Sequence, residues 1–191
     1  MKKENTVCFS GYRPDKFGFL LNENDLNYVN LINNLNAEIK ELYFKGYRNF
    51  IYGGALGFDI IAAEAVVNLK SKSKSVEKSN GNNLKKEFEK NSKNEKPLFE
   101  DINLFLYKPY PEQEKSFGEE WKKRYTSLLP FCKKINLISN GYYSGCFHKR
   151  NRQMVDDSSV LVTFYTGIAG GTKATYNYAL KNGTEIINLY R

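Results

Sequence analysis

Short apolar runs alternate with longer segments of helical periodicity along the whole chain of 191 residues. The runs, rich in apolar and β-branched residues, predict strands, and the periodic segments predict helices between them. The predicted strands are residues 6–9, 47–52, 102–107, 134–139, 160–165 and 185–189, and the later helices are residues 58–69, 119–129, 146–155 and 173–181. This alternation predicts an α/β fold whose mainly parallel sheet of about six strands has helices on both faces.

The first predicted helix has the clearest periodicity. Asn24 or Asp25 can cap its start, and Gly46 ends it. Its apolar residues recur at intervals of three and four, which predicts one buried face. They are Leu26, Val29, Ile32, Leu35, Ile39 and Leu42.

Four polar or glycine-rich turns follow predicted strands, at residues 10–13, 53–57, 108–114 and 167–172. Because the strands of a parallel sheet end on one edge, where ligands bind, we expect these turns to meet there. A glycine turn between strand and helix can cradle a phosphate with free N–H groups and the helix dipole. A purely structural role is the alternative for both glycine loops, and the Gly-Gly-x-x-Gly spacing of residues 53–57 is neither a dinucleotide fingerprint nor a Walker A motif.

The charge of the chain is unevenly distributed. The formal net charge is +8, but between residues 70 and 96 nine lysines stand against four glutamates. We therefore predict one domain over residues 1–191 with a Lys/Asn/Ser/Glu-rich surface insertion at about 71–98, disordered or partly helical around 84–90. The insertion could alternatively be a polyanion-binding arm, so nucleic-acid binding is possible but not favoured.

Several classes of protein fit the sequence poorly. It has no apolar stretch of membrane-spanning length and no N-terminal signal pattern, so we expect a cytoplasmic protein without membrane contact. Three distant cysteines and the single histidine, His148, predict neither a disulfide framework nor a metal site or Ser-His-Asp triad. No cofactor is predicted.

Five motifs together resemble the YpsA-type SLOG proteins, in order and approximate spacing. These motifs are Phe9–Pro14, Gly53–Asp59 with Glu64, Pro111–Glu114, Gly145–Asp156 and Gly170–Thr172. The resemblance covers nearly the whole chain except residues 71–98. It places the chain beside a Rossmann-like superfamily that includes DprA and the LOG phosphoribohydrolases. It implies a Rossmann-like fold, a homodimer, and a pocket for ADP-ribose, an NAD-like or cyclic derivative, or a nucleoside monophosphate.

One departure from the LOG pattern leaves catalysis open. Gly170 and Gly171 match the LOG phosphate-binding glycines, and Arg150 is placed like the LOG arginine, but Asn177 stands where the catalytic glutamate would be. An amide neither stabilises an oxocarbenium-like state well nor activates water. Hydrolysis would then need Asp59, Glu64 or a carboxylate of residues 112–114; the candidates for catalysis are Arg150 and Glu114.

The predicted ligand-binding residues come from all the converging turns. They are Ser10, Gly11, Tyr12, Arg13, Gly53, Gly54, Ala55, Leu56, Gly57, Asp59, Gln113, Arg150, Asn151, Gly170, Gly171 and Thr172. Arginines offer paired donors to phosphate, and Asp59 could accept from ribose hydroxyls. The structural alternatives are salt-bridged arginines, a helix cap at Asp59, and aromatic rings at Tyr12, Tyr110 and Phe147 that pack in the core instead of stacking on a base.

The leading hypothesis is therefore a protein that binds a nucleotide-derived small molecule, as a sensor or by sequestering it. The alternatives are an N-glycosidase or phosphoribohydrolase acting on such a nucleotide, and DprA-like nucleic-acid binding. A regulatory partner for other proteins would leave no sequence signature.

Overall fold

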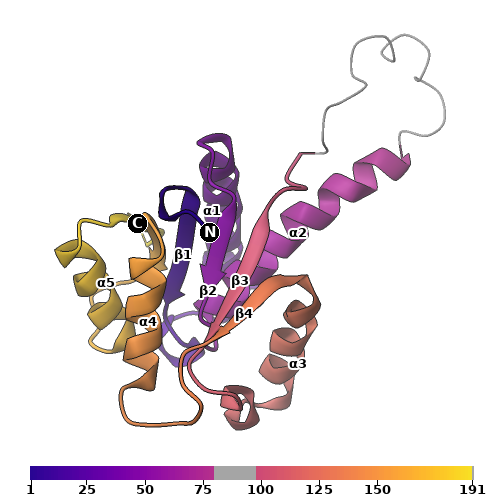
Figure 1. The fold of residues 1–191 in the computed structure, drawn as a ribbon. Coiled ribbons are helices and arrows are strands. Elements are labelled where there is room, and N and C mark those ends of the chain that lie inside the picture. Colours follow the sequence, from indigo (N-terminus) through magenta and orange to yellow (C-terminus); the bar gives the residue numbers. More distant parts are fainter. Residues whose placement is uncertain (80–97, 191) are drawn as a thin grey trace.

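The computed structural model describes residues 1–79 and 98–190, with the backbone alone between 72 and 79. Its centre is a six-stranded sheet in the order β4-β3-β2-β1-β5-β6 (Figure 1). Every neighbouring pair of strands is parallel, which confirms the predicted α/β fold. The strands are β1 (Thr6–Gly11), β2 (Asn49–Tyr52), β3 (Asn103–Lys108), β4 (Cys132–Leu137), β5 (Val160–Phe164) and β6 (Glu185–Asn188).

Helices cover both faces of the sheet, with α1, α2 and α3 on one side and α4 and α5 on the other (Figure 1). The helices are α1 (Leu26–Phe44), α2 (Phe58–Ser79), α3 (Glu119–Leu128), α4 (Cys146–Asp156) and α5 (Gly171–Lys181). Short 3-10 helices are η1 (Lys3–Asn5), η2 (Pro14–Lys16), η4 (Gln113–Ser116) and η5 (Leu129–Phe131). No helix in the described ranges is long and apolar enough to cross a bilayer.

The strands divide their side chains between two hydrophobic cores. Phe9 and Phe50 pack in the core under α1, α2 and α3, whereas their neighbours Cys8 and Ile51 pack in the smaller core under α4 and α5. Successive side chains of a strand point to opposite faces, so a sheet covered on both sides needs continuous apolar strands. All five residues of β5 are buried for this reason.

The buried face of α1 differs from the predicted one. Asp25 caps the helix as predicted, accepting a hydrogen bond from the Asn27 N–H at 2.9 Å. Leu26, however, is 72% exposed, and Leu31 is buried at the corresponding end of the face. Five residues separate the two, which turns Leu26 about 140° away from Leu31 around the helix axis.

The end predicted for α2 at residue 69 was wrong, because the helix continues to Ser79 beyond the sheet (Figure 1). No glycine or proline interrupts residues 58–79, and lysine is compatible with a helix even where a segment has few apolar residues. The stretch at 84–90, predicted to be partly helical, lies outside the described residues.

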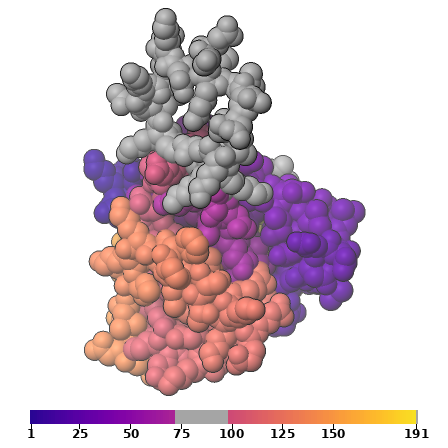
Figure 2. Space-filling model, turned by 90° about the vertical axis from the view of Figure 1, so that its right-hand side faces the viewer, coloured from indigo at the N-terminus to yellow at the C-terminus, as the bar shows by residue number. Residues whose placement is uncertain are grey.

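The strand β4 forms one edge of the sheet, on the side of the molecule seen in Figure 2. It begins two residues before the predicted start at Lys134, and its side chains at Ile135 and Leu137 are about half exposed. An edge strand has a partner on one side only and is less buried, so its apolar residues mark its two ends less clearly than those of β5 do.

Candidate functional site

A cleft of about 350 Å³ lies at the carboxyl ends of the central strands. The sheet grows in one direction from β1 through β2 to β4, and in the other through β5 to β6. Parallel sheets leave a crevice at such a reversal, which is where their ligands bind. The cleft is lined by Ser10, Gly11, Arg13, Asp15, Lys16, Ala55, Asp59, Phe147, His148, Arg150, Asn151, Gly171 and Thr172.

The start of α5 offers an anion-binding surface in this cleft. Gly170 precedes the helix without a side-chain cap among the described residues. Gly171 is exposed, and a Cβ built on it would meet no atom within 4 Å. The first N–H groups of a helix have no partner within the helix and carry the positive end of its dipole. Arg13 and Lys16 line the same cleft and add positive charge.

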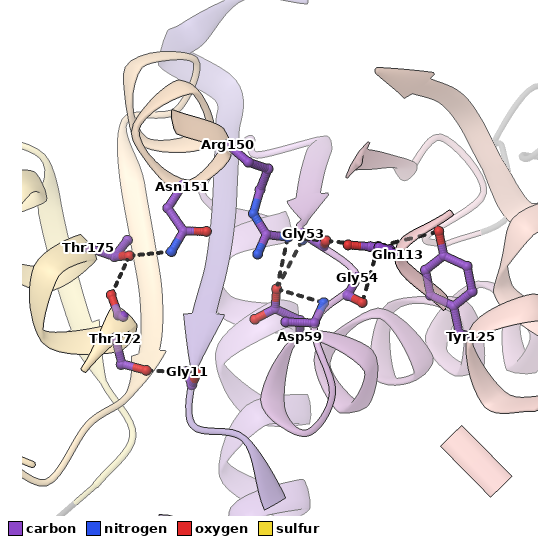
Figure 3. A network of polar contacts seen from close by, with 12 residues as sticks. Gly11, Gly53, Gly54, Asp59, Gln113, Tyr125, Arg150, Asn151, Thr172 and Thr175 are labelled. Carbon is purple, nitrogen blue, oxygen red and sulfur yellow. Dashed lines mark hydrogen bonds and ion pairs between the residues drawn. The ribbon is translucent and has the colours of Figure 1, made fainter. Parts of the chain in front are cut away.

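Arg150 lines the cleft, and its side chain points toward Gly53 and Asp59 (Figure 3). This side chain extends from α4, is 3% exposed, and donates from Nη1 to the carbonyl of Gly53 in the loop after β2. The same nitrogen lies 3.7 Å from Oδ2 of Asp59. That carboxylate accepts the N–H groups of Gly53 at 3.2 Å and Ala55 at 3.4 Å. The contact requires glycine, because a Cβ on Gly53 would overlap the guanidinium and lie 2.7 Å from the Asp59 carboxylate.

Burial governs the electrostatics of this pair. It raises the pKa of Asp59, and the nearby charge of Arg150 opposes that rise. It also lowers the pKa of Arg150, and Asp59 opposes that change. The Nε of Arg150 has no hydrogen-bond partner among the described residues. The guanidinium therefore keeps an unused donor next to the cleft.

The other side of the first glycine loop is covered by Gln113 (Figure 3). Its side-chain Nε2 lies 3.3 Å from the Gly54 carbonyl, to which it donates, and 3.5 Å from the hydroxyl of Tyr125. Gly54 has φ +66°, and a Cβ there would come within 2.7 Å of both side chains. Gly57, at φ +85°, lies directly against the carbonyl of Tyr12. These glycines let other parts of the chain approach the backbone closely.

The second glycine loop, residues 167–172, is held by two hydroxyl groups and a lysine. The Tyr12 hydroxyl accepts the N–H groups of Thr166 at 3.0 Å and Ile168 at 2.9 Å. Thr172 donates to the carbonyl of Gly11 at 2.9 Å, which joins the start of α5 to the end of β1 (Figure 3). Lys16 donates to the carbonyl of Ala169 at 2.9 Å. The loop is thus fixed to β1 and η2.

A helix-to-helix contact fixes the neighbouring wall. Asn151 of α4 donates to the Thr175 hydroxyl at 2.7 Å, and that hydroxyl donates to the carbonyl of Gly171 at 2.9 Å. The start of α5 is therefore connected through Thr175 to the helix that carries Arg150.

The structure brings nine of the predicted ligand-binding residues to the cleft and places seven elsewhere. Those at the cleft are Ser10, Gly11, Arg13, Ala55, Asp59, Arg150, Asn151, Gly171 and Thr172. Those behind or beside it are Tyr12, Gly53, Gly54, Leu56, Gly57, Gln113 and Gly170. That these seven contact a ligand stays a prediction; the ring of Tyr12 is buried, and the glycines at 53, 54 and 57 and the side chain of Gln113 are buried against one another or against neighbouring loops. Leu56 packs on the larger core, and Lys16 comes close to Gly170.

Four residues of the cleft were not among the predicted ligand-binding residues: Asp15, Lys16, Phe147 and His148. Asp15 and Lys16 follow Pro14, which starts η2 and turns the chain back toward the cleft. Proline is favoured in the first turn of a helix, so the pair Arg13-Pro14 was the available signal.

The carboxylates considered for catalysis lie mostly away from the cleft. Glu114 pairs with Lys108 at 2.8 Å, Glu112 pairs with Lys115 at 2.6 Å, and Glu64 is bound by both donors of Arg124 at 2.8 and 2.6 Å. Asn177 lines a separate hollow between α4 and α5. Asp15 and Asp59 are the carboxylates that line the cleft in the described part of the chain.

Comparison of the sequence with known proteins found one family model and two related proteins. The model YpsA, described as the YspA SLOG family, matches residues 7–80. The prophage-derived protein YoqJ of Bacillus subtilis (strain 168) is 28% identical over 166 residues, which cover 80% of this chain and 82% of YoqJ. A UPF0398 protein of Macrococcus caseolyticus (strain JCSC5402) is 23% identical over 163 residues, which cover 84% of this chain and 73% of that protein.

Two solved structures are similar in fold. DNA processing protein A from Helicobacter pylori, described with its single-stranded DNA binding mode, has a TM-score of 0.53 and 16% identity. DprA from Streptococcus pneumoniae has a TM-score of 0.54 and 13% identity. The alignments cover 95% and 96% of this chain but only 63% and 50% of those two chains. At this identity the comparison establishes the Rossmann-like fold.

Proposed function

We propose, from the confirmed resemblance of this chain to the YpsA SLOG family, that the cleft binds a phosphate-bearing, nucleotide-derived small molecule. The ligand class is ADP-ribose, an NAD-like or cyclic derivative, or a nucleoside monophosphate. The protein acts as a sensor of this ligand or sequesters it. The observation that carries the proposal is the uncapped start of α5, exposed in a cleft that Arg13 and Lys16 also line.

The charges of the cleft support a phosphate over a neutral ligand. Asp59 is already matched by Arg150 and by two backbone N–H groups. Asp15 is then offset by one of the two cations Arg13 and Lys16, so a positive charge is left over in addition to the helix dipole. A phosphate accepts from helix N–H groups and from a guanidinium at the same time. In this arrangement the phosphate lies at Gly171 and Thr172.

Calorimetric titration with ADP-ribose, NAD, cyclic ADP-ribose and AMP tests the proposal. Arg13→Ala should lower the affinity for the ligand by about 10-fold or more, since a hydrogen bond to a charged group contributes about 1.5–3 kcal/mol. Arg152→Ala is the matched control, because Arg152 is exposed on α4 and lines the neighbouring hollow instead. If no ligand of the panel binds, or if both variants lose the same affinity, a specific site at Arg13 is refuted.

Chromatography of the incubated ligands separates a binder from a hydrolase. A binder returns each nucleotide intact, whereas an N-glycosidase releases the free base. The positions of Glu114 and Asn177 away from the cleft support a binder. If base is released, Asp15→Asn and Asp59→Asn identify the carboxylate responsible.

Nucleic acid is a competing ligand, and a labelled oligonucleotide at low salt tests it. Binding that is lost steeply with salt and is not displaced by any nucleotide of the panel would favour a DprA-like activity. Sedimentation analysis tests the predicted homodimer. The cytoplasmic location also stays a prediction.

A further inference from the structure

Three aromatic side chains gather next to the cleft. Tyr110 follows β3, Tyr142 lies in the connection from β4 to α4, and Phe147 lies in the first turn of α4. The ring of Tyr110 is 5.5 Å from that of Tyr142 and 5.9 Å from that of Phe147, centroid to centroid, and both pairs meet edge to face. The connection that carries Tyr142 passes below the ends of the strands to reach α4 (Figure 1).

Two of these rings, Tyr110 and Tyr142, border a further hollow of about 530 Å³, which we call the aromatic hollow. It is lined by Tyr110, Pro111, Glu112, Lys115, Ser116, Asn140, Gly141 and Tyr142. Its two charged side chains, Glu112 and Lys115, pair with each other at 2.6 Å. The lining is therefore suited to a flat and uncharged group, in contrast to the basic cleft.

Phe147 connects the aromatic hollow to the cleft. It lines the cleft, and its ring contacts both Tyr110 and Tyr142. The guanidinium of Arg13 lies 5.7 Å from the centroid of the Phe147 ring. A guanidinium that can donate hydrogen bonds to a phosphate thus lies against an aromatic ring, at the border between the cleft and the aromatic hollow.

The exposure of Tyr142 is the second observation. The side chain is 69% exposed although it takes part in a ring cluster. Aromatic rings contribute most when they bury their surface, and a ring this exposed still has a face that a ligand can cover. A nucleobase stacks on such a face regardless of its identity, because every base has a π surface.

We propose that the aromatic hollow is the nucleobase subsite of the ligand whose phosphate lies at α5. This inference rests on the proposed function and makes it more specific. It assigns the specificity for a base over a bare sugar phosphate to Tyr142 and Phe147. The ligand then runs from Gly171 past Arg13 and Phe147 to Tyr142.

The test compares ADP-ribose, which carries adenine, with ribose 5-phosphate, which carries no base. Tyr142→Ala should weaken ADP-ribose binding by about 5- to 100-fold, the range for loss of one aromatic–base stack, and leave ribose 5-phosphate unchanged. Tyr142→Phe keeps the ring and should retain the affinity for ADP-ribose.

The adjacent Tyr143 provides the matched control. It is 42% exposed and makes no ring pair among the described side chains, so Tyr143→Ala should leave both affinities unchanged. Circular dichroism checks that each variant folds, and Phe147→Ala provides a second removal of the aromatic surface.

The outcomes separate this inference from the function on which it rests. If Arg13→Ala weakens ADP-ribose but Tyr142→Ala and Phe147→Ala do not, the cleft binds the phosphate and the subsite proposal is wrong. Equal weakening of ribose 5-phosphate by Tyr142→Ala would also overturn it, because the effect would not depend on the base. If no ligand of the panel binds to the wild-type protein, both proposals fall.

Discussion

Replacing Gly53 by alanine tests whether the glycine loop exists to receive Arg150. The added Cβ would overlap the guanidinium, so Arg150 must withdraw from the Gly53 carbonyl and from Asp59. Gly53 is not among the glycines with positive φ, so alanine adds no backbone strain there. The effect of the substitution should therefore come from the lost contacts alone.

The expected loss of stability follows from those contacts. A hydrogen bond to a charged group contributes about 1.5–3 kcal/mol. Separating a buried ion pair costs about 3–5 kcal/mol, because each charge loses its counter-charge without regaining water. Arg150 and Asp59 are 3% and 5% exposed, so Gly53→Ala should lower the free energy of unfolding by about 3–5 kcal/mol.

Urea unfolding followed by circular dichroism measures this loss, and Gly171→Ala is the matched control. A Cβ at Gly171 meets no atom, so the same substitution there should change stability by less than about 1 kcal/mol. In an Arg150→Ala background, Gly53→Ala should cost much less than in the wild type, which a double-mutant cycle measures. Equal stabilities of Gly53→Ala and Gly171→Ala would refute the reasoning.

Three further predictions concern Asp59, Thr172 and Cys8. Burial raises the pKa of Asp59 above its ordinary value of 3.8, so its contribution to stability is present at low pH and is lost as the pH rises through the folded pKa. The free energy of unfolding of the wild type minus that of Asp59→Asn should accordingly fall as the pH rises, and a constant difference in urea titrations would contradict this. Thr172→Val loses the hydrogen bond to Gly11 and should destabilise by about 1 kcal/mol in urea, whereas Thr172→Ser keeps the hydroxyl and should not. Burial raises the pKa of Cys8 to about 12, so iodoacetamide at pH 8 should modify it only in urea, as mass spectrometry would show; rapid native modification would speak against this burial.

The elements of the fold were largely predictable because each depends on local pattern. The apolar run of β5 and the three- and four-residue spacing in α1 identify a strand and a helix by themselves. The end of α2 was not predicted, because its last turns depend on helix propensity without an apolar face. The exposure of Leu26 was not predicted either, because it depends on the direction of the helix axis.

The candidate site was predictable in its location but not in its packing. The order of strands and helices placed the glycine turns at one edge, and the cleft lies there. That Arg150 covers Gly53 could not be read from the sequence, because 97 residues separate them and the contact depends on how α4 is placed above the sheet. Gln113 approaches Gly54 across 59 residues for the same reason. Glycines that predict an open loop can equally accommodate a side chain from elsewhere in the chain.

The contact of Arg150 with the loop after β2 joins two parts of the chain that are far apart in sequence, and the cleft needs both. The walls of the cleft come from residues 10–59 and 147–172, so no fragment ending before α4 can contain the complete binding surface. A ligand would bind the native chain as a whole and not a folded half, and its binding energy would appear as global stabilisation. Such linkage amounts to about 2.7 kcal/mol at a ligand concentration 100 times the dissociation constant. A rise in melting temperature would therefore report occupancy of the cleft even for a ligand that is never turned over.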